Sequence, residues 1–155
     1  MKILLIEDDE DKRNRISDFI ATIITAEIKE ARSLQSGLQA IIAETHDVVI
    51  LDMTMPTFDI TSEEGGGRPQ AYAGRELLRH MKRRNINTPA IVVTQFDRFG
   101  QGPNSLTLEE LNKDLHASHP GHYLGTVYYS VTLDGWQDAL SRLLSKVTTK
   151  KGPTQ

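Results

Sequence analysis

Acidic side chains follow two of the most apolar segments of this chain. Glu7 and Asp8 come directly after residues 3–6 (ILLI), and Asp52 closes the run at 48–51 (VVIL). A carboxylate at the end of a buried strand is costly unless a cation or hydrogen-bond donors meet it. Because parallel sheets bind ligands at the carboxyl edge of their strands, we expect the three carboxylates to share one pocket there.

The groups expected in this pocket suit phosphoryl chemistry. Three carboxylates repel one another unless a hard divalent cation lies among them, and Mg²⁺ binds through one or two carboxylates while keeping waters for a phosphate ligand. An aspartate carboxylate can act as a nucleophile and form an aspartyl phosphate, which makes Asp52 a candidate acceptor. Thr94 ends a third apolar run, so its hydroxyl could hydrogen-bond the added phosphoryl group.

The elements that must position these residues alternate between strands and helices. Short apolar runs predict strands at residues 3–6, 48–51, 90–93 and 126–129. Apolar residues at helical spacing predict five helices, around residues 16–24, 34–42, 77–81, 108–115 and 136–147. Residues 27–31 alternate charged and apolar side chains, as an edge strand does. We therefore predict an α/β fold: one doubly wound, five-stranded parallel sheet of order 2-1-3-4-5, flavodoxin-like, with five helices.

Length and composition predict a single domain without a membrane anchor. The 155 residues carry 18 basic and 21 acidic side chains, so the net charge of −3 does not favour nucleic acid or an anionic membrane. Cysteine is absent, and no apolar run nears the ~18 residues of a membrane span, so we expect a cytoplasmic protein. The domain should cover residues 1–147, with long loops at about 57–73 and 95–105 and a disordered tail at 148–155.

These residues resemble the receiver domains of two-component response regulators. The matching positions are the acidic pair Glu7-Asp8, Asp52 with Pro56 after it, and the hydroxyl residue Thr94. The resemblance implies that Asp52 accepts a phosphoryl group from a histidine kinase or phosphotransfer protein in a phosphorelay. It also implies that Thr94 is drawn toward the phosphoryl group.

The same resemblance implies a magnesium site and a switch residue. Mg²⁺ would be held by Asp8, Asp52 and the backbone carbonyl of Thr54, with Glu7 acting through water. An aromatic residue of the last strand usually rotates when the domain is phosphorylated. The candidates for that residue are Tyr128 and Tyr129.

The last strand is also where the chain departs from the family. Receiver domains normally carry a lysine at its end, followed by proline. Here that position falls on Val131 or Thr132, and neither alignment restores a lysine. Without the lysine, phosphorylation would switch the domain only partly, unless Arg68 or Arg98 from the long loops supplies the charge.

Two further departures lie in the loops after Asp52 and Thr94. The glycine that the family places shortly after the acceptor corresponds to Gly74, which follows Asp52 by 22 residues. Gln95 is larger than the residue usually found after the hydroxyl position, so it could narrow access to the acceptor.

Simpler explanations exist for some of these patterns. Residues 7–9 (EDD) could cap the first helix, since acids favour helix N-termini. His116, His119 and His122 suggest a zinc site, but Pro120-Gly121 breaks any helix that would align them, so exposed loop histidines are favoured.

We predict a stand-alone receiver domain that signals through protein–protein contacts. Only about ten residues follow the last helix, too few for an output domain, so an unknown downstream protein or a homodimer would carry the signal. We expect no enzymatic activity beyond self-phosphorylation and autodephosphorylation, and no direct contact with nucleic acid or membrane.

Two alternatives remain open. One is a pseudo-receiver, a binding module that recognises its partner regardless of phosphorylation. The other is a Mg²⁺-dependent phosphohydrolase with an aspartyl nucleophile. That class usually has a second aspartate two residues after the nucleophile, where this chain has Thr54.

Overall fold

One parallel sheet organises the chain. The computed structural model describes residues 1–59 and 70–151. The sheet has the order β2-β1-β3-β4-β7 and is formed by β1 (Lys2–Ile6), β2 (Glu27–Ala31), β3 (Val48–Leu51), β4 (Ala90–Thr94) and β7 (Tyr123–Tyr128). The helices are α1 (Glu10–Ile23), α2 (Leu34–Ala43), α3 (Ala73–Arg83), α4 (Leu108–Ser118) and α5 (Gly135–Lys151). Since β7 is the fifth strand of the sheet along the chain, the predicted order 2-1-3-4-5 is confirmed.

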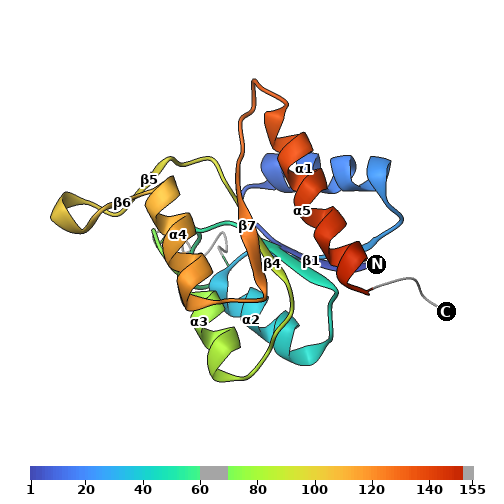
Figure 1. The fold of residues 1–155 in the computed structure, drawn as a ribbon, viewed down its shortest axis with the longest axis horizontal. Coiled ribbons are helices and arrows are strands. Elements are labelled where there is room, and N and C mark those ends of the chain that lie inside the picture. Colours follow the sequence, from blue (N-terminus) through green and yellow to red (C-terminus); the bar gives the residue numbers. More distant parts are fainter. Residues whose placement is uncertain (60–69, 152–155) are drawn as a thin grey trace.

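Different helices cover the two faces of the sheet. α1 and α5 lie on one face, and α2, α3 and α4 lie on the other (Figure 1). Successive residues of a strand point to opposite faces, so Ile3 packs with α1 and α5 while Leu4 packs with the other three helices. Because both faces are covered, β3 and β4 are buried along their whole length.

Local signals in the sequence account for several element boundaries. β2 is mostly exposed and lies at the edge of the sheet, as its alternating charges predicted. Ser33 caps α2 and Thr107 caps α4, each in a capping box with the residue three positions later. α3 ends just before Asn85, whose φ of 56° is left-handed and stops the helix.

The second long loop contains secondary structure of its own. It forms the two-stranded hairpin of β5 (Arg98–Phe99) and β6 (Leu106–Thr107), with the 3₁₀ turn η1 (Gly102–Asn104) between them. The hairpin projects from the side of the domain that carries α4 (Figure 1). Phe99 anchors it, because this side chain is buried in the core beneath α3 and α4.

The first long loop and the tail are described in part. An antiparallel bridge between Met55 and Gln70 closes the base of the first loop. Arg68, proposed above as a substitute cation, lies outside the described residues. α5 continues to Lys151, so residues 148–151 of the tail predicted to be disordered are helical, while residues 152–155 lie outside the described residues. None of the helices in the described ranges is long and apolar enough to cross a membrane.

Candidate functional site

Three carboxylates meet at the carboxyl edge of the sheet. Glu7 and Asp8 follow β1, Asp52 follows β3, and these strands are paired in parallel with Ile6 opposite Leu51. One carboxylate oxygen from each of the three acids lies within 4.8 Å of the others. Glu7 and Asp52 are buried, whereas Asp8 is half-buried. The structure thus brings together the three acids that the strand ends placed in one pocket.

A lysine from α1 extends into this pocket. The ammonium of Lys12 donates to Oδ2 of Asp52 at 2.9 Å and lies 2.6 Å from Oε1 of Glu7. It also donates to the backbone carbonyl of Val93, at 2.9 Å. Only 3% of the Lys12 side chain is exposed. A cation of the chain itself therefore links the ends of β1, β3 and β4.

Lys12 is the residue that the sequence analysis missed. The expected cation was the family lysine after the last strand, or an arginine from one of the long loops. Ile16 and Ile20 are buried on the inner face of α1, and Lys12 lies one turn before Ile16 on the same face. A lysine in line with an apolar face was the available signal.

The charges in the pocket are only partly balanced. Burial raises the pKa of Glu7 to about 8; Lys12 opposes this shift, and the negative charge of Asp52 reinforces it. Burial works to lower the pKa of Lys12, but Asp52 and Glu7 together raise it above its usual value, so the ammonium keeps its charge. One ammonium therefore leaves the acids with unbalanced negative charge, and the pocket can accept a further cation.

The backbone around Asp52 fixes its carboxylate. Oδ1 of Asp52 accepts hydrogen bonds from the amides of Met53 at 2.6 Å and Thr54 at 3.4 Å. Gly74, at the start of α3, lies against this segment, and a Cβ there would come within 2.6 Å of the Asp52 carbonyl oxygen. The long loop thus returns to the position that the family glycine requires. With Oδ1 held by two amides, Oδ2, which contacts Lys12, is the oxygen that faces the pocket.

Thr94 and Tyr129 lie next to the residues that Lys12 contacts. Thr94 is fully buried, directly follows Val93, and accepts a hydrogen bond from the amide of Phe96 at 3.2 Å. Tyr129 is buried with its ring centroid 5.7 Å from the Lys12 ammonium. Tyr128 is half exposed, so Tyr129 is the candidate aromatic that lies at the pocket.

Neither the position of the family lysine nor Arg98 supplies a cation to the pocket. Val131 and Thr132, where the family has lysine, are exposed after β7. Arg98 is exposed on the hairpin and donates to Oγ of Ser105 at 3.1 Å, so it does not serve the acidic pocket. Gln95 is also exposed.

The simpler explanations apply to other residues than the pocket acids. Asp9 caps α1, because its side chain accepts from the amide of Lys12 at 3.0 Å. Among residues 1–59 and 70–151, only Glu7, Asp8 and Asp52 form a group of potential metal ligands, so the three histidines do not make a zinc site there. They are not exposed loop histidines either, because His116 lies in α4 and His119 is buried where the chain turns back toward β7.

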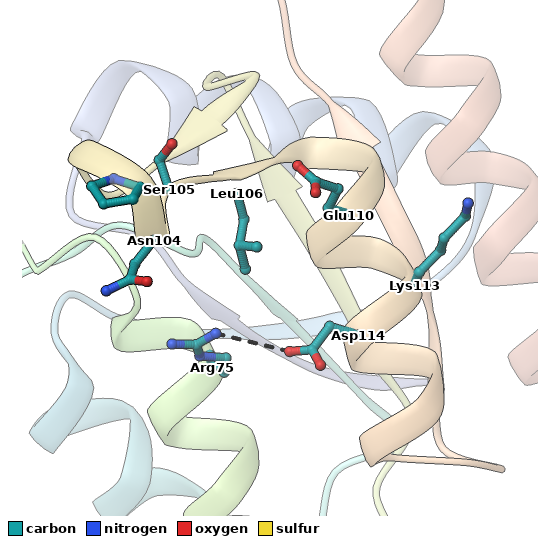
Figure 2. A pocket seen from close by; sticks show the side chains of 8 residues that line it. Arg75, Asn104, Ser105, Leu106, Glu110, Lys113 and Asp114 are labelled. Carbon is teal, nitrogen blue, oxygen red and sulfur yellow. Dashed lines mark ion pairs between the residues drawn. The ribbon is translucent and has the colours of Figure 1, made fainter.

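A hollow lies apart from the acidic pocket, between α3, α4 and the hairpin (Figure 2). Its volume is about 790 Å³, and most of its charged groups already have partners. Arg75 lies 3.8 Å from Asp114 and stacks on Tyr72, while Glu110 completes the cap of α4. We attribute the hollow to the inserted hairpin rather than to ligand binding.

Comparison with known proteins gives this geometry a context. A family model described as the response regulator receiver domain matches residues 3–106. An uncharacterized protein, y4jR, from Sinorhizobium fredii is 32% identical over 143 residues, which cover 90% of this chain and 94% of that protein. The Detocs response regulatory protein DtcB of Enterobacter cloacae is 29% identical over 96% of this chain and 99% of its own length.

Solved structures share the fold. The receiver domain of the Francisella response regulator 1452 superimposes with a TM-score of 0.64 at 19% sequence identity. The alignment covers 96% of this chain and 98% of that domain, so the sheet order and helix layers described above are those of a solved receiver domain.

Proposed function

This chain belongs to the response regulator receiver domain family, and we propose that it accepts a phosphoryl group on Asp52 from a histidine kinase or phosphotransfer protein. The observation that carries the proposal is the environment of Asp52: a buried carboxylate with two amides on Oδ1 and an ammonium on Oδ2. In the transfer, an Asp52 oxygen bonds to phosphorus while the P–N bond to the donor imidazole breaks. The imidazole takes up a proton as it leaves.

The acidic pocket fits the Mg²⁺ that receiver domains generally bind. Three carboxylate oxygens lie close together, and a cation of the chain already lies between two of these acids. Asp8, Asp52 and the backbone carbonyl of Thr54 would hold the ion, with Glu7 acting through water. When bound, Mg²⁺ would supply positive charge against the oxygens of the phosphoryl group.

The remaining pocket residues have roles that follow from their positions. The hydroxyl of Thr94, at the end of β4, would donate to a phosphoryl oxygen in place of its present local contact. Tyr129 would move with it, since the amide of Tyr129 donates to the Thr94 carbonyl at 2.7 Å. The name of the Enterobacter relative, a response regulatory protein, supports a signalling role through contacts with another protein.

We also propose that the chain acts on no outside phosphate ester. A hydrolase of the aspartyl-nucleophile class needs an acid or base near its nucleophile, and Thr54 occupies the usual position. Its hydroxyl lies 3.4 Å from the carbonyl of Ala71. Phosphorylation and dephosphorylation of Asp52 itself would be the only reactions.

Incubation with acetyl phosphate and Mg²⁺, followed by intact mass measurement, tests the proposal. We expect the wild-type protein to gain one phosphoryl group, Asp52→Ala to gain none, and Asp8→Asn to gain it much more slowly. Thr94→Ala serves as the variant with an intact acceptor and should still be labelled.

Two results would contradict the proposal. Absence of labelling in the wild type, under conditions that label another receiver domain, would favour the phosphorylation-independent pseudo-receiver. The exposed Val131 and Thr132 at the lysine position are the observation that favours this alternative. Labelling that persists in Asp52→Ala would place the acceptor elsewhere.

A further inference from the structure

Lys12 occupies an unusual position for a lysine. It lies in the first turn of α1, after the N-cap Asp9 and the acidic residues Glu10 and Asp11. The positive end of the helix dipole disfavours a cation in this turn and favours acids such as its two neighbours. Burying the ammonium adds a further cost. Contacts outside the helix must therefore account for a buried lysine here.

Those contacts use every hydrogen-bond donor that the ammonium has. Lysine offers three N–H groups, and the three acceptors are Oε1 of Glu7, Oδ2 of Asp52 and the carbonyl of Val93. Each acceptor belongs to the end of a different strand. Lys12 is thus a fixed crosslink between the proposed acceptor and β4, one residue before Thr94.

We propose that Lys12 replaces the lysine that is absent after β7: its ammonium binds the phosphoryl group on Asp52 and transmits that event to β4. This inference rests on the proposed function of Asp52. The lysine comes from α1 rather than from the last strand, so the charge reaches the acceptor from another element of the fold.

Charge balance indicates that Lys12 stays in the pocket when Mg²⁺ is present. The pocket holds three acidic groups, so when all three are ionised one divalent ion and one ammonium together match their charge, and neither cation has to leave. Phosphorylation then adds further negative charge, and an ammonium already in the pocket opposes it.

The same donor count explains how the signal could leave the pocket. An ammonium drawn to a phosphoryl oxygen must give up one of its three acceptors. The carbonyl of Val93 carries only a partial negative charge, so it attracts the ammonium less strongly than the carboxylate of Glu7 does. Release of Val93 would free the end of β4, where Thr94 and the backbone of Tyr129 respond.

Substitution of Lys12 separates this role from simple competition with the metal. We would measure Mg²⁺ affinity and beryllofluoride binding through the fluorescence of Trp136, the single tryptophan, which packs 5.1 Å from Tyr129. Labelling by acetyl phosphate is followed by intact mass. Lys29→Met, at an exposed lysine paired with Glu44, is the matched control.

For Lys12→Met, we expect Mg²⁺ to bind at least as tightly as in wild type, because a competing positive charge is gone. The labelling rate and beryllofluoride affinity should fall roughly ten- to hundredfold, as expected for a lost hydrogen bond between charged groups. Lys12→Arg should recover part of both. Lys12→Met labelled as fast as wild type, or faster, would overturn the proposal and make Lys12 a competitor of Mg²⁺.

A second variant covers the case in which Lys12→Met does not fold. Glu7→Gln/Lys12→Met removes one charge of each sign and so keeps the net charge of the pocket. It is compared with Glu7→Gln alone, and the double variant should be labelled at least tenfold more slowly. Equal rates would overturn the role of Lys12, whereas an unlabelled wild type would instead contradict the function of Asp52.

Discussion

Gly74 determines how closely α3 can approach the proposed acceptor. A methyl group at this position would lie 2.6 Å from the carbonyl oxygen of Asp52 and 2.9 Å from Cα of Met53. Both are backbone atoms, which cannot move aside as the end of a side chain can. The glycine is therefore required by contact with the site, even though the inserted loop separates it from Asp52 in the sequence.

We predict that Gly74→Ala lowers the free energy of unfolding by about 1–3 kcal/mol, because the added methyl forces the backbone of the acceptor segment to shift. Labelling of Asp52 by acetyl phosphate should slow as well. Urea denaturation measures the first effect and intact mass the second. Gly135→Ala is the control, since nothing lies within 4 Å of a Cβ at the start of α5. Equal stability of the two variants would contradict the prediction.

For individual residues, the sequence identified the three acids of the pocket but not Lys12, the cation that contacts them. Glu7, Asp8 and Asp52 could be placed together because each follows an apolar strand, and parallel strands end at one edge. Lys12 could not be placed in the same way, because its position depends on how α1 packs over the sheet. A long side chain can extend from a helix to the end of a strand, and helical periodicity alone does not show where its charged group lies.

Asp8 and Asp9, which precede α1, have different roles in the helix and in the pocket. Asp9 caps the helix through the amide of Lys12, whereas Asp8 belongs to the group of potential metal ligands. These adjacent residues have the same side chain, so their difference comes only from the direction in which each one points. The change from strand to helix after Ile6 sets those directions.

We predict opposite effects for the two alanine substitutions. Asp9→Ala should lower the free energy of unfolding by about 1 kcal/mol, because α1 loses its cap, while Mg²⁺ binding persists. Asp8→Ala should leave stability without Mg²⁺ unchanged or higher, because repulsion with its neighbours is relieved, and should abolish Mg²⁺ binding. Urea denaturation with and without the ion separates these outcomes. Loss of Mg²⁺ binding in Asp9→Ala alone would contradict the assignment.

Tyr72 connects the two long loops. Its hydroxyl donates to the carbonyl of Phe99 at 2.9 Å, and its ring stacks against Arg75 at 4.0 Å. Tyr72 precedes α3 and Phe99 belongs to β5, so one side chain fixes the hairpin to the helix that carries Gly74. The described end of the first insertion is thus joined to the hairpin of the second.

We predict that Tyr72→Phe lowers the free energy of unfolding by about 0.5–1.5 kcal/mol, since one hydrogen bond is lost and the ring contacts remain. Amide hydrogens of β5 and β6 should exchange faster with solvent. Tyr128→Phe is the control, because Tyr128 is half exposed and its hydroxyl makes no hydrogen bond within residues 1–59 and 70–151. If hydrogen exchange is unchanged in Tyr72→Phe, the hairpin is held by Phe99 alone.

Most elements of the sheet and its helices could be predicted, but the inserted hairpin could not. Solid apolar runs and helical spacing identify the main elements, and Thr107 with Glu110 marks the start of α4. β5 and β6 have two residues each, too few for alternation to show. The burial of Phe99 arises from packing under α4, and its glycine-rich neighbourhood in the sequence suggested only a loop.

At the scale of the whole molecule, the acidic pocket couples ion binding to folding. The three acids come from segments far apart in the sequence and lie close together only when β1 and β3 are paired. Repulsion among them therefore destabilises the folded chain in the absence of an ion, although Lys12 offsets part of it. An ion that binds the folded state alone stabilises it by an amount set by its concentration and dissociation constant.

We predict that Mg²⁺ at 100 times its dissociation constant stabilises the protein by about 2.7 kcal/mol. For a chain of this size that corresponds to a rise in Tm of roughly 5–11 °C. Asp8→Asn should abolish the rise, because the pocket loses a ligand. Asp11→Asn should keep it, because Asp11 is exposed and pairs with Arg15 away from the pocket. Calorimetric scans over a Mg²⁺ series at constant ionic strength give the measurement, and an equal rise in both variants would mean that the ion binds elsewhere on the molecule.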